Sequence, residues 1–377
     1  MNAATLYVHV PFCVVKCGYC DFNSYADHDG ASHDRFLHAL DVELARTAPE
    51  SPPSVFFGGG TPTFLDPQRF ESLMRIVGRH VDLAACPEVS LEANPESVTR
   101  EKAELAIDAG VNRFSIGAQT FQPERLKFLD RAHDAAGVER AFLALRDAGA
   151  TNVSLDLMFG LPGETLEEWS ADLARALSLG PDHMSCYNLT FEPGTKLEHA
   201  MRQGSVSPNE PEVDLEMFDH TRTELERHGS LAYEISNFAR RGGPCRHNDH
   251  YWLQGDYAGV GPGAASHRAG ERTTNLRVVE RWAQAVESGA PAWGDREVLT
   301  PDQRAGEAIW LGLRRADGID LAKAAARLSI DLEARFGRTI DGFVDDGLIR
   351  RSGGRIVLTD LGIRVADSVT QEFLQPL

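Results

Sequence analysis

The sequence predicts an α/β protein in which an open (β/α)6 partial barrel is followed by a smaller α+β domain. Short strand patterns alternate with helical patterns of about ten or more residues, as expected for β/α units around a parallel sheet. About six such units are visible, fewer than the eight of a closed barrel. From residue 300 onward, this alternation gives way to short helices and a hairpin. We therefore predict a barrel domain over 1–240, a linking segment over 241–299 and a C-terminal domain over 300–377.

Local patterns predict the individual elements. Strands are short apolar runs that end in polar or turn residues, and they are predicted at 6–10, 55–57, 89–91, 111–116, 155–158 and 183–189. Helices show apolar residues at helical spacing and are predicted at 34–45, from 67 onward, and at 99–109, 165–179 and 210–228. In the C-terminal domain we expect helices at 302–313, 321–328 and 332–345, then a hairpin over 348–357 that turns at Gly353 and Gly354.

Composition limits the functional classes. The formal net charge of -18 and the pI of about 5.2 argue against broad binding to nucleic acid or to anionic membranes. The sequence has no run of about 18 apolar residues and no charged-then-apolar leader, so we expect neither membrane spanning nor secretion. Six cysteines in 377 residues do not form a disulfide framework. A reducing, cytoplasmic location is the expectation.

Three cysteines stand close together directly after the first predicted strand. Cys13, Cys17 and Cys20 form a C-x3-C-x2-C array, and a loop after a strand can turn three thiolates toward one point. Thiolates suit iron–sulfur clusters or zinc. A cube-shaped 4Fe–4S cluster held by three cysteines leaves one iron open to a substrate. Zinc is the alternative and would need a fourth ligand such as His9 or His28, although structural zinc sites usually show paired cysteine knuckles.

Polar and glycine residues follow several predicted strands, which is where α/β folds place their ligands. The run Gly58 to Gly60 and Thr61 follows the second strand, and a bare backbone there would let a ligand amino group approach a carbonyl. Each candidate also has an ordinary structural interpretation. The glycines are compatible with a tight turn. Glu92 could cap a helix, Asp156 could bond a loop backbone, and Arg131 could be a surface charge.

The segment YVHVPFCVVKCGYCDF, residues 7–22, resembles the radical S-adenosylmethionine (SAM) superfamily. Its flanks Y-x-H-x-P-F-C and C-D-F resemble one branch, the oxygen-independent coproporphyrinogen III dehydrogenases and the related haem chaperones of the HemW type. The resemblance implies the same open barrel and a 4Fe–4S cluster on Cys13, Cys17 and Cys20. In this family the open iron binds the amino and carboxylate groups of SAM. One electron, supplied to the cluster by a donor, then splits SAM into methionine and a 5′-deoxyadenosyl radical.

The resemblance also implies a set of SAM-binding residues. The tyrosine six places before the first cysteine lies by SAM, and the aromatic before the third contacts the adenine; these are Tyr7 and Tyr19. The GGGTPT stretch binds the methionine amino group, and four strand-end or loop residues complete the pocket. They map to Gly59, Gly60, Thr61, Glu92, Gln119, Arg131 and Asp156. A carboxylate suits a ribose diol, and an arginine suits the methionine carboxylate in a bidentate pair.

A second motif lies in the linking segment. Its histidines, His247 and His250, are close to aromatics, and imidazole suits iron while aromatic rings pack on a flat macrocycle. The structural alternative is that the aromatics anchor the segment to the barrel while His247 and Asn248 bond the backbone. H-N-x-x-Y-W matches the motif associated with haem binding in the haem chaperones, and this match implies a haem site at His247, Asn248, Tyr251 and Trp252.

The C-terminal pattern resembles a winged helix, which is a fold that often binds DNA. Residues 296–377 contain 12 Lys and Arg against 13 Asp and Glu, a net charge of -1. A DNA reader should carry a clear basic face. We therefore expect no nucleic-acid partner and interpret this domain as a lid or a partner-docking domain.

Three functions compete. The first is a haem chaperone that binds the cluster, SAM and haem and passes haem to acceptor haem proteins. The family resemblance implies respiratory proteins as acceptors. Association with a membrane would then occur through the acceptor. The second is the dehydrogenase, but that branch carries a further cysteine where Phe22 stands, and a substantial arm before the position of Tyr7. The third is another radical SAM enzyme with an unknown small substrate. Whether the chaperone also cleaves SAM, and so acts as an enzyme, is left open.

Overall fold

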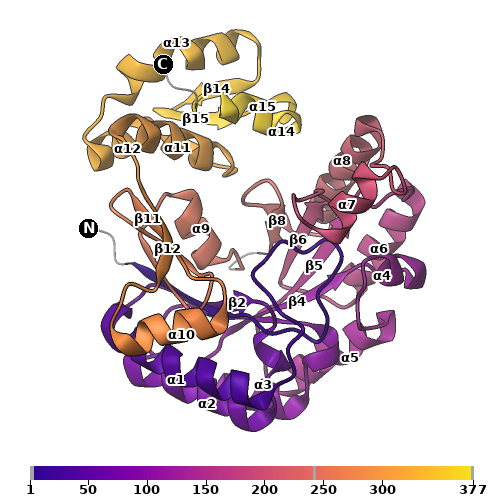
Figure 1. The fold of residues 1–377 in the computed structure, drawn as a ribbon. Helices are drawn as coiled ribbons and strands as arrows, with labels where there is room; N and C mark the ends of the chain where they lie inside the picture. Colours follow the sequence, from indigo (N-terminus) through magenta and orange to yellow (C-terminus); the bar gives the residue numbers. More distant parts are fainter. Residues whose placement is uncertain (1–3, 241–242, 375–377) are drawn as a thin grey trace.

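The predicted open barrel is confirmed. The computed structural model describes residues 4–240 and 243–374. Within them, six parallel strands pair side by side in chain order, and Figure 1 shows the curved sheet to which they belong. They are β1 (Thr5–Val10), β2 (Val55–Gly59), β3 (Val89–Ala93), β4 (Arg113–Gln119), β5 (Val153–Phe159) and β6 (His183–Asn188). Because parallel strands all end at one edge, the residues near their carboxyl ends are brought together.

Helices connect these strands and cover the outer face of the sheet (Figure 1). Amphipathic patterns explain them: α2 begins at the Asp66 cap and buries Phe70, Leu73 and Val77. A capping box formed by Thr165 and Glu168 starts α6. The helices are α1 (Gly30–Thr47), α2 (Pro67–His80), α3 (Arg100–Asp108), α4 (Pro123–Phe128), α5 (Ala135–Asp147) and α6 (Leu166–Ser178).

The strands have two different faces because successive side chains alternate. Val8, Phe57, Leu91 and Leu155 are among the fully buried side chains that pack against the covering helices. Their neighbours in sequence point into the barrel instead. Burial of the outer set fixes the register, since a shift by one residue would exchange the two faces. The core therefore determines which side chains are presented to a ligand.

The sheet continues beyond the predicted barrel. On one side, α7 (Lys196–Arg202) and α8 (Pro211–Arg227) precede β7 (Leu231–Ala232) and β8 (Asn237–Ala239), and β8 pairs with β6. On the other side, β9 (Tyr257–Val260) runs parallel to β1, and β10 (Ala265–Arg268), β11 (Glu271–Asn275) and β12 (Trp293–Val298) extend it. The order of the described strands runs from β12 to β7, so they leave the barrel open.

The segment predicted as a linker thus contributes strands to the barrel sheet. It also forms α9 (Arg246–Trp252) and α10 (Val279–Ser288), and α10 packs against α1. The predicted boundary at 240 and 241 borders residues 241–242, which lie outside the described residues. The division into three domains remains a prediction. The pairing of β9 with β1 shows that residues 257–298 are built onto the barrel.

The C-terminal domain has its own apolar core around Ile309, Phe336, Ile340 and Ile356. Three of its helices and its hairpin fall where the sequence predicts them, and the hairpin turns at Gly353 and Gly354, which both have a positive φ. The elements are α11 (Pro301–Leu313), β13 (Ile319–Asp320), α12 (Leu321–Leu328), α13 (Leu332–Asp345), β14 (Ile349–Ser352), β15 (Arg355–Leu358), α14 (Asp360–Arg364) and α15 (Ala366–Gln371).

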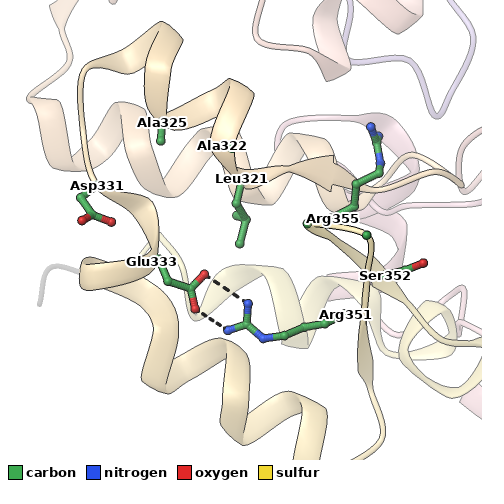
Figure 2. Close-up of a pocket in the computed structure, with 10 residues that line it drawn as sticks. Leu321, Ala322, Ala325, Asp331, Glu333, Arg351, Ser352 and Arg355 are labelled. Carbon is green, nitrogen blue, oxygen red and sulfur yellow. Dashed lines mark hydrogen bonds and ion pairs between the residues drawn. The ribbon is translucent and has the colours of Figure 1, made fainter.

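A surface hollow of about 430 Å³ lies between α12, α13 and the β14–β15 hairpin, as Figure 2 shows. Arg351 crosses it to form an ion pair with Glu333 at 2.7 Å, and it also contacts Asp341 at 2.9 Å. Both carboxylates are largely exposed, so the pairs are screened by water and contribute little to stability. Their effect is to hold the hairpin against α13.

The C-terminal domain lies over α9 and the strands beside it (Figure 1). Arg315 forms an ion pair with Asp249 of α9 at 2.8 Å, and the guanidinium of Arg314 lies 4.9 Å from the ring centroid of Trp252. Arg327 donates to the carbonyl of Gln254. These polar contacts fix the domain on the helix that carries the H-N-x-x-Y-W motif. Among the described helices, none has both the length and the apolar character to cross a membrane.

Candidate functional site

A cavity of about 240 Å³, here called the central cavity, lies inside the barrel. Every one of the strands β1 to β6 contributes a side chain to it, and α9 and the loop after β1 close it. The strand residues include Tyr7, Phe56, Glu92, Ser115, Asp156 and Ser185. Three residues predicted for SAM binding, Tyr7, Glu92 and Asp156, are thus brought to one place. Glu92 lies near the end of its strand as expected, whereas Asp156 lies in the middle of β5.

Two buried carboxylates give this cavity its electrostatic character. Burial, together with the nearby Asp156 carboxylate, raises the pKa of Glu92 to about 7, while the Gly59 amide donates to Glu92 at 3.2 Å and opposes the shift. Burial also raises the pKa of Asp156, although hydroxyls donate to it from Ser185 at 2.7 Å and Ser115 at 2.9 Å. The raised pKa values favour the protonated form of both groups, and in either form they can form hydrogen bonds with a ligand that carries several hydroxyls.

Tyr7 is held in place by His9. The Asn23 carbonyl can only accept, so Nε2 of His9 donates to it at 2.8 Å and Nδ1 accepts from the Tyr7 hydroxyl at 3.0 Å. His28, the other histidine considered as a fourth zinc ligand, contacts the carbonyl of Val14 at 3.2 Å. Both ring nitrogens of His9 are therefore already engaged in orienting Tyr7.

The three cysteines of the predicted cluster each contact a polar side chain, and for Cys13 and Cys17 this side chain comes from a distant part of the chain. Thr61 donates to the Cys13 sulfur at 3.5 Å, and Arg131 donates to the Cys17 sulfur at 3.5 Å. The Cys20 sulfur lies 3.9 Å from the Ser24 hydroxyl. Burial raises the pKa values of the Cys13 and Cys20 thiols, and neighbouring thiolates add to this rise. The thiols therefore lie within electrostatic reach of one another.

Among the described residues, no group of three or more His, Cys, Asp and Glu side chains is arranged to hold one metal ion. A 4Fe–4S cubane needs a different arrangement from a single metal ion, because each of its three cysteine ligands binds a separate iron. The thiol donor set, with donors aimed at two of the sulfurs, fits the chemistry of such a cluster. Cys13, Cys17 and Cys20 stay the predicted ligands.

A hydrogen-bonded chain connects the cysteine loop to the strand ends. Asn94 donates to the Thr61 hydroxyl at 2.6 Å and accepts from Arg131 at 2.5 Å. Arg131 also donates to the Gly117 carbonyl at 2.7 Å and lies 3.4 Å from the Tyr19 hydroxyl. Its Nε atom is buried and has no partner among the described residues. Arg131 thus joins the predicted cluster loop to the predicted SAM residues and keeps one donor free.

Asn94 is missing from the sequence-based set, although the signal was present. It is a polar residue just after β3, two places beyond Glu92. Gly117 also acts here: a Cβ atom at this position would lie 3.0 Å from both Asn94 Oδ1 and Gln119 Nε2. Its missing side chain makes room for the predicted residue Gln119, which has a left-handed φ of 64° at an irregularity in the β4–β5 pairing.

The glycines of the GGGTPT stretch are required by the protein's own neighbours. Gly59 has a φ of 103°, and a Cβ atom there would lie 2.5 Å from the His9 ring. At Gly60, a Cβ atom would lie 2.7 Å from the Phe12 carbonyl. The stretch therefore packs tightly against β1 and the cysteine loop. This tight packing brings the Thr61 hydroxyl to Cys13.

Arg113 is a second residue that the sequence analysis did not include. It lines the central cavity, is 2% exposed, and its Nε atom has no partner among the described residues. Arg113 and Ser115 alternate with the apolar Phe114 and Ile116 along β4. That alternation was a usable signal, because it indicates a strand with one polar face. This buried guanidinium forms no ion pair with a carboxylate of the described residues, and it supplies a positive charge beside the two acidic groups.

The H-N-x-x-Y-W motif lies on α9 at the wall of the central cavity. His247 is 1% exposed; its Nδ1 atom contacts the Ser54 hydroxyl at 2.8 Å and its Nε2 atom contacts the Tyr251 hydroxyl at 2.8 Å. Burial lowers the pKa of His247 to about 3. Asn248 and Tyr251 line the cavity, whereas Trp252 packs under Arg314. The motif thus supports the cavity wall, and both His247 nitrogens are engaged.

Comparison with known proteins places the chain in a family. Residues 7–176 match the family model of the radical SAM superfamily, and residues 299–365 match the HemN C-terminal domain. "Heme chaperone HemW" of Bacillus subtilis (strain 168) is 35% identical over 98% of this chain and 99% of that protein. The protein of that name from Mycobacterium tuberculosis (strain CDC 1551 / Oshkosh) is 36% identical over 98% of this chain and 94% of that protein. The chain belongs to the HemW family of the radical SAM superfamily.

The solved structures agree on the fold. The coproporphyrinogen III oxidase (HemN) of Escherichia coli, described as a radical SAM enzyme, superposes on this HemW-family chain with a TM-score of 0.85. It covers 100% of this chain and 91% of the other at 24% identity, so the likeness establishes the shared fold. Membership of the radical SAM superfamily implies a 4Fe–4S cluster and SAM. The thiols of the cysteine loop suit the chemistry of the cluster, and the polar side chains of the central cavity suit the polar groups of SAM.

A second cavity, here called the interdomain cavity, has a volume of about 420 Å³. The sheet extension β9 to β11 forms its floor, the end of α9 one wall and α11 of the C-terminal domain its roof. Tyr7 and Tyr251 line both cavities, so the two adjoin. Its characteristic residues are Tyr257, His267, Arg272, Glu307 and Trp310. In this HemW-family chain, the second cavity is mainly aromatic and apolar, in contrast to the carboxylates of the first.

Proposed function

We propose that this chain is a haem chaperone that holds a 4Fe–4S cluster and SAM at the barrel mouth, binds haem, and delivers it to acceptor haem proteins. The observation that carries the proposal is the H-N-x-x-Y-W helix, which walls the central cavity of a radical SAM barrel through Asn248 and Tyr251. It joins a predicted haem motif to predicted SAM residues in one place. The relatives named as haem chaperones over nearly the whole chain support it.

The roles of individual residues follow from their contacts. Cys13, Cys17 and Cys20 would hold the cluster, whose chemistry is to pass one electron to SAM. Arg131 would meet the methionine carboxylate, since it has an unused buried donor. Glu92 and Asp156 would accept from the ribose hydroxyls.

The remaining predicted residues have supporting positions. Tyr7 is fixed by His9 beside the cavity, and Tyr19 lies against Arg131. Gly59, Gly60 and Thr61 would receive the methionine amino group. The side chain of Gln119 comes close to Gly117, at the carboxyl end of β4.

The dehydrogenase reaction is not favoured. Phe22 lines the central cavity at the place where that branch carries a further cysteine. A phenyl ring can neither donate a proton nor bind metal. The chaperone function also requires partners: an electron donor for the cluster and an acceptor haem protein, with respiratory proteins and contact with a membrane through the acceptor as the family expectation. All six cysteines are free thiols, which agrees with the reducing cytoplasm that we include in the proposal.

The test uses the full chain, reconstituted anaerobically with iron and sulfide. We expect it to bind haem in a saturable titration, to bind SAM only when the cluster is present, and to form no vinyl product from coproporphyrinogen III under reducing conditions. Formation of protoporphyrinogen would support the dehydrogenase instead. Absence of saturable haem binding would reject the chaperone proposal.

A further inference from the structure

The interdomain cavity contains a histidine that the central site does not use. His267 lies on β10 with Tyr257 of β9 and Arg272 of β11 as its cross-strand neighbours. It is only 6% exposed. Its Nδ1 atom contacts the Gly255 carbonyl at 3.4 Å, which leaves Nε2 as the other hydrogen-bonding atom of the ring. Nε2 is buried and has no partner among the described residues.

An unpartnered buried imidazole nitrogen requires an explanation, because leaving it unbonded costs free energy. Gly255 can only accept at its carbonyl, so Nδ1 carries the proton and Nε2 presents its lone pair. A carbonyl that fixes the tautomer through the opposite ring nitrogen is the arrangement found around metal-binding histidines.

The surroundings of His267 suit a flat, mostly apolar ligand with a carboxylate edge. The Tyr257 ring centroid lies 5.9 Å from that of His267, and Tyr251 packs edge-on against Tyr257 at 4.7 Å. Trp310 of α11 lines the opposite side. Aromatic side chains favour stacking on a macrocycle. The cation in the cavity is Arg272, whose guanidinium pairs with Glu307 and is placed to exchange this partner for a ligand carboxylate.

We propose that the interdomain cavity is the haem-binding site and that Nε2 of His267 is an axial ligand of the haem iron. This inference rests on the proposed chaperone function and adds the location of the haem-binding site. In this arrangement, Tyr251, Tyr257 and Trp310 contact the macrocycle, and Arg272 pairs with a propionate. Tyr7 and Tyr251, which line both cavities, then stand between haem and the other predicted SAM residues. The C-terminal domain covers the site through α11, which makes this domain the cover that opens for haem exchange.

The same geometry assigns a different role to His247. Ser54 and Tyr251 occupy its two ring nitrogens, so it cannot bind iron without breaking a buried hydrogen bond. Its contact with the Tyr251 hydroxyl instead positions a ring that lines both cavities. His247 is therefore a positioning residue. The H-N-x-x-Y-W motif then supports the wall of the haem pocket, and His267 binds the iron.

The test is an anaerobic haem titration of the full chain and of His267→Ala, followed by absorption and electron paramagnetic resonance spectra. We expect the wild type to show histidine ligation. The variant should lose that signature and bind haem at least about tenfold more weakly, since even outer-shell changes cost this much at metal sites. Added imidazole should restore the histidine-type spectrum in His267→Ala, because the missing ring leaves space for it. Cluster absorbance and SAM binding should stay unchanged.

The control variant is His228→Ala, which removes an exposed histidine at the end of α8. His247→Ala should weaken haem binding but keep the histidine signature. If His267→Ala keeps the wild-type signature and affinity, the assignment of the ligand is wrong while the chaperone proposal stands. Loss of the signature in His247→Ala with retention in His267→Ala would move the iron to the motif. A wild type that binds no haem would reject the chaperone proposal itself.

Discussion

The central cavity and the interdomain cavity adjoin at Tyr7 and Tyr251, yet they are built differently. The central cavity takes its polar side chains from β1 to β6, so the barrel core alone positions them. The interdomain cavity depends on the sheet extension, α9 and the C-terminal domain. Carboxylates and hydroxyls dominate the first. The second contains aromatic rings, the Arg272–Glu307 ion pair and an imidazole nitrogen that has no partner in the described part of the chain. This difference agrees with the proposal that the barrel provides the SAM site and that the interdomain cavity provides the haem site.

The largest expected effect comes from removing the cluster, which tests whether the two cavities act independently. Cys17→Ala takes away one of three predicted ligands, so the cluster absorbance should be lost completely. Haem binding should be unchanged, because His267 lies in the other cavity. Anaerobic absorption spectra and haem titration measure both. Cys86→Ala, a buried thiol that donates to the Glu88 carbonyl, is the matched control and should keep the cluster. An intact cluster in Cys17→Ala would show that this thiol is not a ligand.

The next effect concerns only the central cavity and is a pH dependence. The pKa of Glu92 is about 7 in the folded protein against an ordinary value near 4.3. The folded state therefore binds this proton more tightly than the unfolded chain does. The resulting stabilisation is present below about pH 4 and is lost as the pH rises through 7.

Glu92→Gln removes this titration, so relative to the wild type the variant should gain about 3 kcal/mol in unfolding free energy between pH 4 and pH 8. Urea unfolding of the cluster-free protein at several pH values measures the difference. Glu101→Gln, at an exposed carboxylate on α3, should show no such trend. A constant difference between Glu92→Gln and wild type over this range would contradict the raised pKa.

The smallest effect concerns the cover of the interdomain cavity. Arg314→Ala removes the guanidinium that lies over Trp252, which joins the C-terminal domain to α9. A cation–π contact of this kind contributes about 1 kcal/mol. We expect a stability loss of that size and faster haem dissociation, measured by thermal unfolding and by haem transfer to excess apomyoglobin. Arg338→Ala, an exposed arginine on α13, should leave both unchanged. Unchanged dissociation in Arg314→Ala would argue against a cover function.

Local patterns predicted much of the fold but only part of the site. The alternation of short strands and helices was sufficient for the six-stranded barrel, and the helices of the C-terminal domain fell close to their predicted ranges. Strands β9 to β12 were not predicted, because a glycine-rich run such as 257–267 shows no clear period and becomes a strand only by pairing with β1. Their pairing decides whether the linking segment adds to the barrel.

The candidate site shows the same division. Tyr7, Glu92 and Asp156 were predicted and do line one cavity. Asn94 and Arg113 were missed, since a single asparagine or arginine in a strand pattern has an ordinary structural explanation. Only contacts show that Asn94 joins Thr61 to Arg131.

By itself, the sequence determined the cysteine spacing, the order of strands and helices and the residue types at the strand ends, because these depend on near neighbours in the chain. The tertiary structure decided which side chains meet across long separations. It engaged both nitrogens of His247 with Ser54 and Tyr251 and, within residues 4–240 and 243–374, left one nitrogen of His267 without a partner. Hydrogen-bond satisfaction in a buried site depends on groups far apart in sequence, and so it cannot be predicted from local patterns.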